Sequence, residues 1–278
     1  HGRVTTSIIL PTTQPPTGEN VRIPYIGVTG FTTSREVAEI LGTIPQDTHR
    51  LLMVGVLVSW KTLLGIPAKW PRRYPKLQDF GSVFINDARC LNLVHFNTQD
   101  PDALHAQLCE VTERGGPHLQ GFQLNVAWPS LRQLGLYHGT RAAAGAASMR
   151  IVLQVGHGAL DAVERSPVQL AKRVATYTHL IDDVLIDPSG GKGQPFDPAF
   201  ARDCLRAIRD RGLDVGLGVA GGLSATTLDL VAPLVEEFPD CSIDAEGRLR
   251  TATDALDGDA ARAYVHAALD MLTNGKTP

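Results

Sequence analysis

Short apolar runs alternate along the chain with stretches whose apolar residues recur at the spacing of one helix face. The runs have the length of β-strands, and the run at 51–59 is apolar throughout, as expected for a parallel strand covered on both faces. The pattern predicts strands at residues 23–28, 51–59, 91–96, 121–126, 150–155, 184–187, 215–219 and 242–244. It predicts helices at residues 33–41, 101–114, 198–211 and 259–272, and two more that begin near residues 166 and 224.

Residue types at several expected helix ends support these assignments. Thr33 and Glu36 have the spacing of a capping box, and Asp100 is a candidate N-cap for the helix that follows it. Pro167 suits the first turn of a helix, and Gly212 suits a C-terminal stop.

Strands that alternate with helices pair in parallel through right-handed crossovers. Eight such repeats predict an α/β protein with a single closed (β/α)8 barrel, the TIM barrel. A doubly wound open sheet is the alternative, but residues 27–30 lack the G-x-G-x-x-G sequence that this fold places after its first strand. The predicted domains are a Pro/Thr-rich N-terminal arm at 1–22 and the barrel at 23–278. The arm and a long loop after the second strand, at 60–90, have two alternative expected roles, to cover the barrel mouth or to pair with another subunit.

Composition restricts the classes of partner. The net charge of -3 gives no basic surface for nucleic acid and no polybasic membrane patch, so a small-molecule substrate is expected. The four cysteines lie far apart without a C-x-x-C pair, which favours reduced thiols and a cytoplasmic location. Secretion after removal of a leader is the alternative. Glycine makes up 27 of the 278 residues, about 9.7 %, against a usual share of ~7 %. This excess directs attention to clusters of glycine.

Two glycine clusters follow neighbouring strands, at the end of the barrel where active sites lie. Gly221 and Gly222 follow the seventh strand, and a second cluster follows Asp187 at the end of the sixth, namely Gly190, Gly191 and Gly193 with Lys192 between them. Backbone N–H groups of consecutive glycines can converge on an anion, and the helix expected from Ser224 adds a positive N-terminus. The clusters therefore predict a phosphate site. Tight turns without a ligand are the alternative interpretation.

These segments carry a resemblance to a known family. Asp187 and the sequence GGKGQPFD at 190–197 resemble the D...GGxGxxFD segment of phosphoribosylanthranilate isomerase, and VAGGL at 219–223 is similar to the (L/V)AGGL of that family. FQLN at 122–125 is similar to its QLHG, and WPR at 70–72 to its SPR. The matches keep the order of the family, and the resemblance spans residues 23–272.

The resemblance implies roles for the matched residues. Asp187 corresponds to the general acid that protonates the ring oxygen of the sugar, and the glycine clusters correspond to phosphate-binding segments. Arg72 corresponds to the arginine that binds an aromatic carboxylate, a task suited to a planar bidentate donor.

The chain also departs from the family pattern. Ile26 stands where the family has its general-base cysteine, and Asn125 replaces a histidine. Glu246 and Gly247 replace a phosphate-binding segment, where a carboxylate repels phosphate unless a cation compensates. The sequence offers Lys192, Arg248 and Arg250 as such cations.

Other residues are candidates for the missing base. His157 follows the fifth strand and His95 ends the third, and an imidazole there can act as a base at neutral pH. Each is otherwise a histidine bound to backbone. Lys61 after the second strand can form a Schiff base if it is desolvated, and is otherwise a solvated lysine. No H-x-H or H-E-x-x-H pair occurs, so no metal is expected.

The leading hypothesis is an isomerase-like enzyme that acts on a phosphorylated or ribosylated small molecule, without an organic cofactor, and with a changed substrate or base. A catalytically inactive ligand-binding paralogue is the second hypothesis, favoured by Ile26 and Glu246. A barrel lyase or aldolase that uses Lys61 is the third. The chain is expected to be a monomer or a homodimer.

Overall fold

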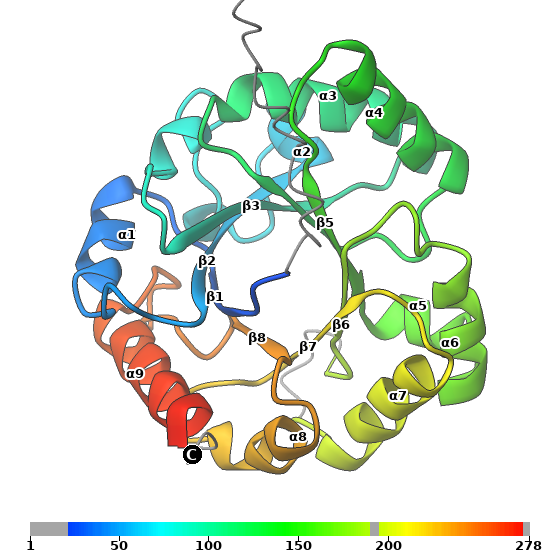
Figure 1. Ribbon diagram of the computed structural model, residues 1–278. Helices are drawn as coiled ribbons and strands as arrows, with labels where there is room; N and C mark the ends of the chain where they lie inside the picture. Colours follow the sequence, from blue (N-terminus) through cyan, green and yellow to red (C-terminus); the bar gives the residue numbers. More distant parts are fainter. Residues whose placement is uncertain (1–21, 190–194, 275–278) are drawn as a thin grey trace, which may run out of the picture.

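The computed structural model of the chain describes residues 22–189 and 195–274. Their strands pair in parallel, in sequence order, and close into a TIM barrel with helices around it, as Figure 1 shows along the barrel. The predicted fold is confirmed. The strands are β1 (Tyr25–Thr29), β2 (Leu51–Ser59), β3 (Cys90–Asn97), β4 (Gly121–Leu124), β5 (Arg150–Val155), β6 (Asp183–Ile186), β7 (Gly216–Ala220) and β8 (Ser242–Ala245).

Helices connect the strands on the outside of the barrel (Figure 1). The α-helices are α1 (Ser34–Leu41), α2 (Trp60–Leu63), α3 (Leu104–Gly115), α4 (Leu131–Ala143), α5 (His157–Asp161), α6 (Pro167–Ala175), α7 (Pro198–Asp210), α8 (Ala232–Glu237) and α9 (Gly258–Asn274). Short 3-10 helices are η1 (Pro71–Arg73), η2 (Phe80–Val83), η3 (Pro101–Ala103) and η4 (Leu228–Leu230). The expected long loop at 60–90 therefore holds α2, η1 and η2.

Side chains of each strand alternate between two apolar layers. Ile26 and Val28 of β1 belong to the large core between strands and helices, whereas Tyr25 packs inside the barrel. The remaining members of the inner cluster are Met53, Leu91, Leu93, Val152, Leu185 and Ala220. Because the inward positions recur every second residue, the chemistry at the barrel mouth depends on which residues share this phase.

Two of the four helix-end predictions are confirmed, because Pro167 lies in the first turn of α6 and Gly212 follows α7 with φ +66°. The capping box is half formed: Thr33 accepts a hydrogen bond from the Glu36 backbone, but the Glu36 carboxylate accepts from the backbone of Thr32 instead of Thr33. Asp100 makes no capping hydrogen bond through its side chain, so that prediction is wrong. A 3-10 turn separates Asp100 from α3, which begins three residues later than expected at Leu104.

The connection after β7 also differs from the prediction. No helix begins at Ser224. The Thr227 hydroxyl donates to the carbonyl of Gly222 and accepts from the backbone of Ser224, which closes a turn instead. Regular helix begins only at α8, whose first turn contains Pro233. The positive helix N-terminus expected directly behind Gly222 is therefore absent from this part of the described chain.

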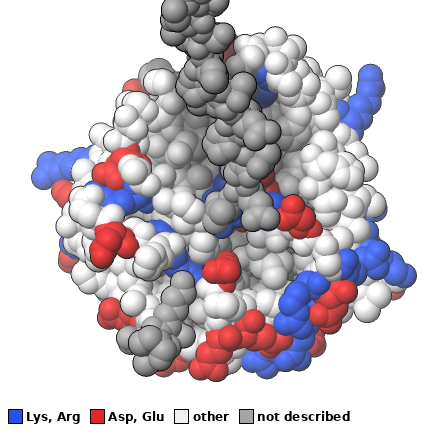
Figure 2. All heavy atoms as spheres, in the orientation of Figure 1, with Lys and Arg blue, Asp and Glu red and all other residues white. Residues whose placement is uncertain are grey.

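The described residues contain no helix that is long and apolar enough to cross a membrane. All four cysteines are free thiols. On the face drawn in Figure 2, Lys and Arg side chains lie beside Asp and Glu side chains. Attraction of a polyanion is not favoured where the signs mix in this way. The expected lack of a nucleic-acid partner stays a prediction.

Candidate functional site

A cavity of about 520 Å³ opens at the carboxyl ends of the strands. Four strands bring one lining residue each to it, namely His95, Gln154, Ala220 and Asp244, and Asp187 directly follows β6. The loops after β2, β6, β7 and β8 supply Trp70, Arg73, Ser189, Gly221, Gly222, Glu246, Gly247 and Arg248. The cavity therefore occupies the position that (β/α)8 enzymes use for catalysis.

Two glutamines join two carboxylates at the floor of this cavity. The Gln123 amide donates to Asp244 at 3.1 Å and to the Gln154 side-chain oxygen at 3.0 Å. The Gln154 amide donates in turn to Asp187 at 3.1 Å. The Thr29 hydroxyl also donates to Asp244, at 3.0 and 3.1 Å to its two oxygens. This network fixes both carboxylates toward one cavity.

Burial shifts the pKa values of two side chains at the cavity floor, Asp244 and His95. Asp244 is 4 % exposed, and this burial raises the pKa of its carboxyl to about 7, although hydrogen bonds from Gln123 and Thr29 oppose the shift. Burial lowers the pKa of His95, which is 5 % exposed, so its imidazole is neutral at pH 7. A carboxyl group with a pKa near 7 can both give and take a proton at neutral pH.

An arginine from the long loop spans the cavity wall. Arg73 pairs with Glu246 at 3.1 Å and with Asp254 at 2.8 Å, and its guanidinium lies 5.2 Å from the centre of the Trp70 ring. The bond from Arg73 lowers the pKa of Asp254. Arg73 therefore compensates the charge of Glu246. Arg250 donates to the backbone oxygen of Thr29, and the nearby charge of Glu246 raises the pKa of its guanidinium against the lowering by burial.

Position 221 has no room for a side chain, because Asp187 and Ser189 lie against it. The φ of Gly221 is +107°, and a Cβ atom there would lie 2.7 Å from both Asp187 Oδ1 and Ser189 Oγ. The close approach of a carboxylate explains this glycine without a bound anion. Gly222 also has a positive φ, of +67°. The predicted residues Gly190, Gly191, Lys192 and Gly193 lie outside the described residues.

The structure brings some of the predicted site residues together and leaves others apart. His95, Asp187, Gly221, Gly222, Glu246, Gly247 and Arg248 line the cavity. Arg72 and Asn125 are exposed and do not line it. His157 starts α5 and pairs with Asp161 at 3.2 Å, and Lys61 lies near the ring of Trp60. Neither His157 nor Lys61 lines the cavity.

The predicted residue Arg72 does not line the cavity, whereas its neighbour Arg73 does, and the reason is geometric. Both lie in the 3-10 turn η1, where successive side chains point about 120° apart, so only one can face the cavity. Asn125 follows the last residue of β4, and the inward position of that strand is Gln123.

Ile26, which the family resemblance matched to the general-base cysteine, does not face the interior of the barrel. Ile26 packs in the core between strands and helices, whereas the inward positions of β1 are Tyr25, Gly27 and Thr29. A Cβ atom on Gly27 would lie 2.7 Å from Asp244 Oδ1. The space next to β1 is therefore filled by the Asp244 carboxylate.

The sequence interpretation missed seven residues of the site. They are Gln123, Gln154, Asp244, Arg73, Trp70, Ser189 and Ala220. The first three are polar residues at alternating positions of predicted apolar strands, and this alternation was the available indication of an inward polar layer. Nothing in the irregular sequence of the long loop indicated Trp70 or Arg73.

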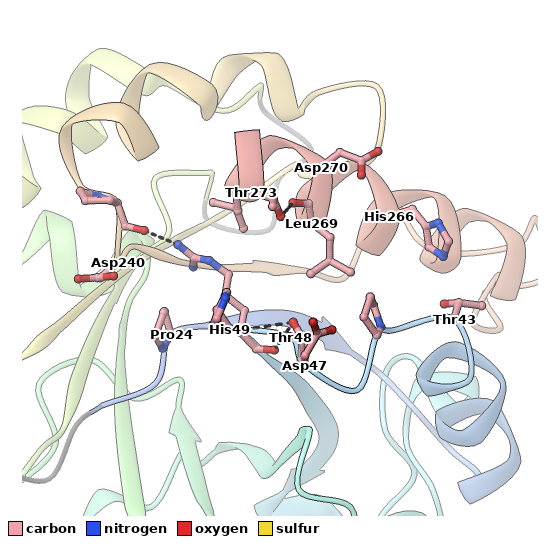
Figure 3. Close-up of a pocket in the computed structure, with 14 residues that line it drawn as sticks. Pro24, Thr43, Asp47, Thr48, His49, Asp240, His266, Leu269, Asp270 and Thr273 are labelled. Carbon is pink, nitrogen blue, oxygen red and sulfur yellow. Dashed lines mark hydrogen bonds between the residues drawn. The ribbon is translucent and has the colours of Figure 1, made fainter. Parts of the chain in front are cut away.

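Two further cavities lie near the amino ends of the strands. One, of about 420 Å³, lies between α9 and the turn that carries Asp47 and His49, as Figure 3 shows. The guanidinium of Arg50 at this cavity donates to the carbonyls of Pro239 and Cys241. Another, of about 640 Å³, lies beside Arg150. In the described part of the chain, no group of three or more His, Cys, Asp or Glu side chains could hold a metal ion.

Comparison with known proteins supports the fold. No protein-family model and no curated protein matches the chain. A monomeric form of the dimeric phosphoribosylanthranilate isomerase from Thermotoga maritima matches with a TM-score of 0.53 and 13 % identity, over 88 % of this chain and 98 % of that one. The carboxyl transferase domain of Rhizobium etli pyruvate carboxylase with 3-bromopyruvate matches with a TM-score of 0.53 and 10 % identity.

The second match covers 92 % of this chain and 48 % of the other, so the chain spans about half the length of the pyruvate carboxylase structure. At these identities the likeness establishes a shared TIM-barrel fold, and function has to be argued from the cavity.

Proposed function

We propose that the chain is an isomerase-like enzyme that acts on a phosphorylated or ribosylated small molecule in the cavity at the carboxyl ends of the strands. Asp187 acts as the general acid and Asp244 as the general base. The observation that carries the proposal is the pair of carboxylates held toward one cavity by Gln123 and Gln154.

An isomerisation needs two proton transfers and no net change in composition. Asp187 gives a proton to a substrate oxygen, and Asp244 removes a proton from a carbon. A base with a pKa of about 7 accepts such a proton more readily than an ordinary carboxylate, and it is half ionised at neutral pH. Activity is therefore expected to rise with pH through about 7, as Asp244 loses its proton.

The structure weakens the arguments for the two other hypotheses. An inactive paralogue was favoured by the loss of a base at Ile26, but that side chain points away from the cavity, and Asp244 supplies a carboxylate inside it. An aldolase was favoured by Lys61, which does not line the cavity.

The test begins with a thermal-shift screen of phosphorylated sugars and their unphosphorylated forms, because a ligand that binds the folded state raises the melting temperature. Each ligand found is then incubated with enzyme in D2O and followed by NMR. Isomerisation through a base introduces solvent deuterium at the reacting carbon. Asp187→Asn and Asp244→Asn should each lower this rate by about 10²–10⁴ and still bind the ligand.

Asp161→Asn is the matched control, because Asp161 lies on α5 and does not line the cavity. Normal turnover by both Asp187→Asn and Asp244→Asn contradicts the proposal.

A further inference from the structure

The polar groups at the cavity floor use their own donors internally. The amide of Gln123 donates to Asp244, and the amide of Gln154 donates to Asp187. The Ser189 hydroxyl also donates to Asp187, at 2.7 Å. Among the described residues, the floor thus presents the remaining lone pairs of two carboxyl groups. A hydroxyl group both donates and accepts hydrogen bonds, so it suits these carboxyl groups whether or not they carry a proton.

The histidine of the floor favours hydroxyl groups over other donors. The Nδ1 atom of His95 is buried without a hydrogen-bond partner, and the ring lines the cavity. A hydroxyl both donates and accepts, so it satisfies this nitrogen in either tautomer of the neutral ring, whereas an ammonium group can only donate. An unpartnered buried polar atom is costly, and a bound hydroxyl removes that cost.

Among the described lining residues, the partly buried arginine of the cavity wall is already paired with carboxylates. Arg73 is committed to Glu246 and Asp254, with about four fifths of its side chain buried between them and Trp70. An anionic group at this wall would have to break those pairs. Arg248 lines the cavity from the exposed rim, away from the floor.

An exposed aromatic side chain also lines the cavity. Trp70 is 48 % exposed. The guanidinium of Arg73 lies 5.2 Å and the ammonium group of Lys69 lies 5.1 Å from the centre of its ring. An exposed indole beside carboxylates suits a ring that has polar edges and an apolar face.

We propose that the cavity binds an uncharged cyclic polyol, a sugar or cyclitol ring, whose apolar face stacks on Trp70. Its hydroxyl groups form hydrogen bonds with Asp187, Asp244 and Glu246 and satisfy His95. The inference concerns the same site as the proposed function and names the part of the substrate that reaches the floor.

The test measures binding of D-ribose, D-glucose and myo-inositol to the full chain at millimolar concentration, by calorimetry and tryptophan fluorescence. Ribose 5-phosphate and inorganic phosphate are titrated in parallel. At least one uncharged polyol should bind. Trp70→Ala should weaken that binding about tenfold, and Trp70→Phe less, because the smaller ring keeps part of the stacking surface. Trp60→Phe, outside the cavity, should bind as the wild type does.

The proposal is overturned if none of the three polyols binds, if inorganic phosphate or ribose 5-phosphate binds and D-ribose does not, or if Trp70→Ala binds the polyol as tightly as the wild type. Failure of the acid–base assignment is recognised separately. In that case Asp187→Asn and Asp244→Asn retain turnover, while the effect of Trp70→Ala on polyol binding persists.

Discussion

Asp244 is a carboxyl group whose protonation is set by its surroundings. Its two oxygens accept bonds from Thr29 and Gln123, yet desolvation prevails and raises its pKa to about 7 from the usual 3.8. Between about pH 4 and pH 7, the folded state therefore keeps a proton that the unfolded chain has already released. Stability falls as pH rises through that window, because the unfolded state binds fewer protons.

Asp244→Asn, which cannot ionise, should remove this pH dependence. Relative to wild type, the free energy of unfolding of the variant should gain about 1.4 kcal/mol for each pH unit between about 4 and 7, and change no further above 7. Urea unfolding of both proteins at pH 5, 6, 7 and 8 measures the difference. Asp161→Asn, an exposed carboxylate, serves as the control. A constant difference between Asp244→Asn and wild type across this range contradicts the assigned pKa.

Single site residues were predictable where strand ends define their position. Asp187 and His95 line the cavity because the carboxyl end of a barrel strand leads directly into this face, and their catalytic roles stay predictions. Asp244 lies in a short strand that was predicted. Its bond to Gln123 joins residues more than 100 positions apart, and no local sequence pattern reveals such a contact.

Two loops are joined across the cavity mouth by Arg73. It comes from the loop after β2, and its partners Glu246 and Asp254 come from the loop after β8. Asp254 has a positive φ of +66°, a costly backbone conformation for a residue other than glycine. The bidentate pair with Arg73 helps to hold this turn.

Arg73→Ala should lower the free energy of unfolding by about 1–3 kcal/mol, because it leaves two partly buried carboxylates without their partner. Amide exchange should accelerate in residues 64–80 and 246–257. Arg72→Ala is the matched control, since Arg72 lies in the same turn and is exposed. Arg73→Lys should fall between the two, because lysine cannot make the bidentate contact. Equal exchange in Arg73→Ala and Arg72→Ala contradicts the role of the pair.

Elements were predicted well where apolar periodicity sets them. All eight strands lie within a few residues of their expected positions, since burial on both faces requires apolar runs. The connection after β7 was not predicted, because the Thr227 hydroxyl closes a turn there with the Ser224 N–H and the Gly222 carbonyl. The helix α4 was not predicted either, and Gly135 and Gly139 weaken its helical pattern.

The two ends of the barrel carry different kinds of charge pair. At the amino ends, Arg150 of β5 binds Asp183 of β6 at 2.7 Å, with the Asp183 side chain 4 % exposed. Arg150 also donates to the backbone oxygen of Ile23, before β1. This pair closes the bottom of the barrel and lies away from the candidate site.

Arg150→Met should therefore lower the free energy of unfolding by about 3–5 kcal/mol, because it leaves a buried charge on Asp183 unpaired. Turnover and polyol binding of the folded variant should not change. Denaturant unfolding and activity measured on the same preparation test both statements. The double variant Arg150→Met/Asp183→Asn should recover part of the loss. A decrease in kcat/KM without loss of stability contradicts this division between the two ends.

The glycine of β1 has a consequence for how such a barrel can change its chemistry. A side chain at Gly27 would meet the Asp244 carboxylate at 2.7 Å and the Met53 methyl group at the same distance. A side chain at position 27 and a carboxylate at position 244 therefore exclude one another. A lineage that moves from one to the other must change both positions, so residues 27 and 244 should covary among homologues, with a larger residue at 27 where 244 is small.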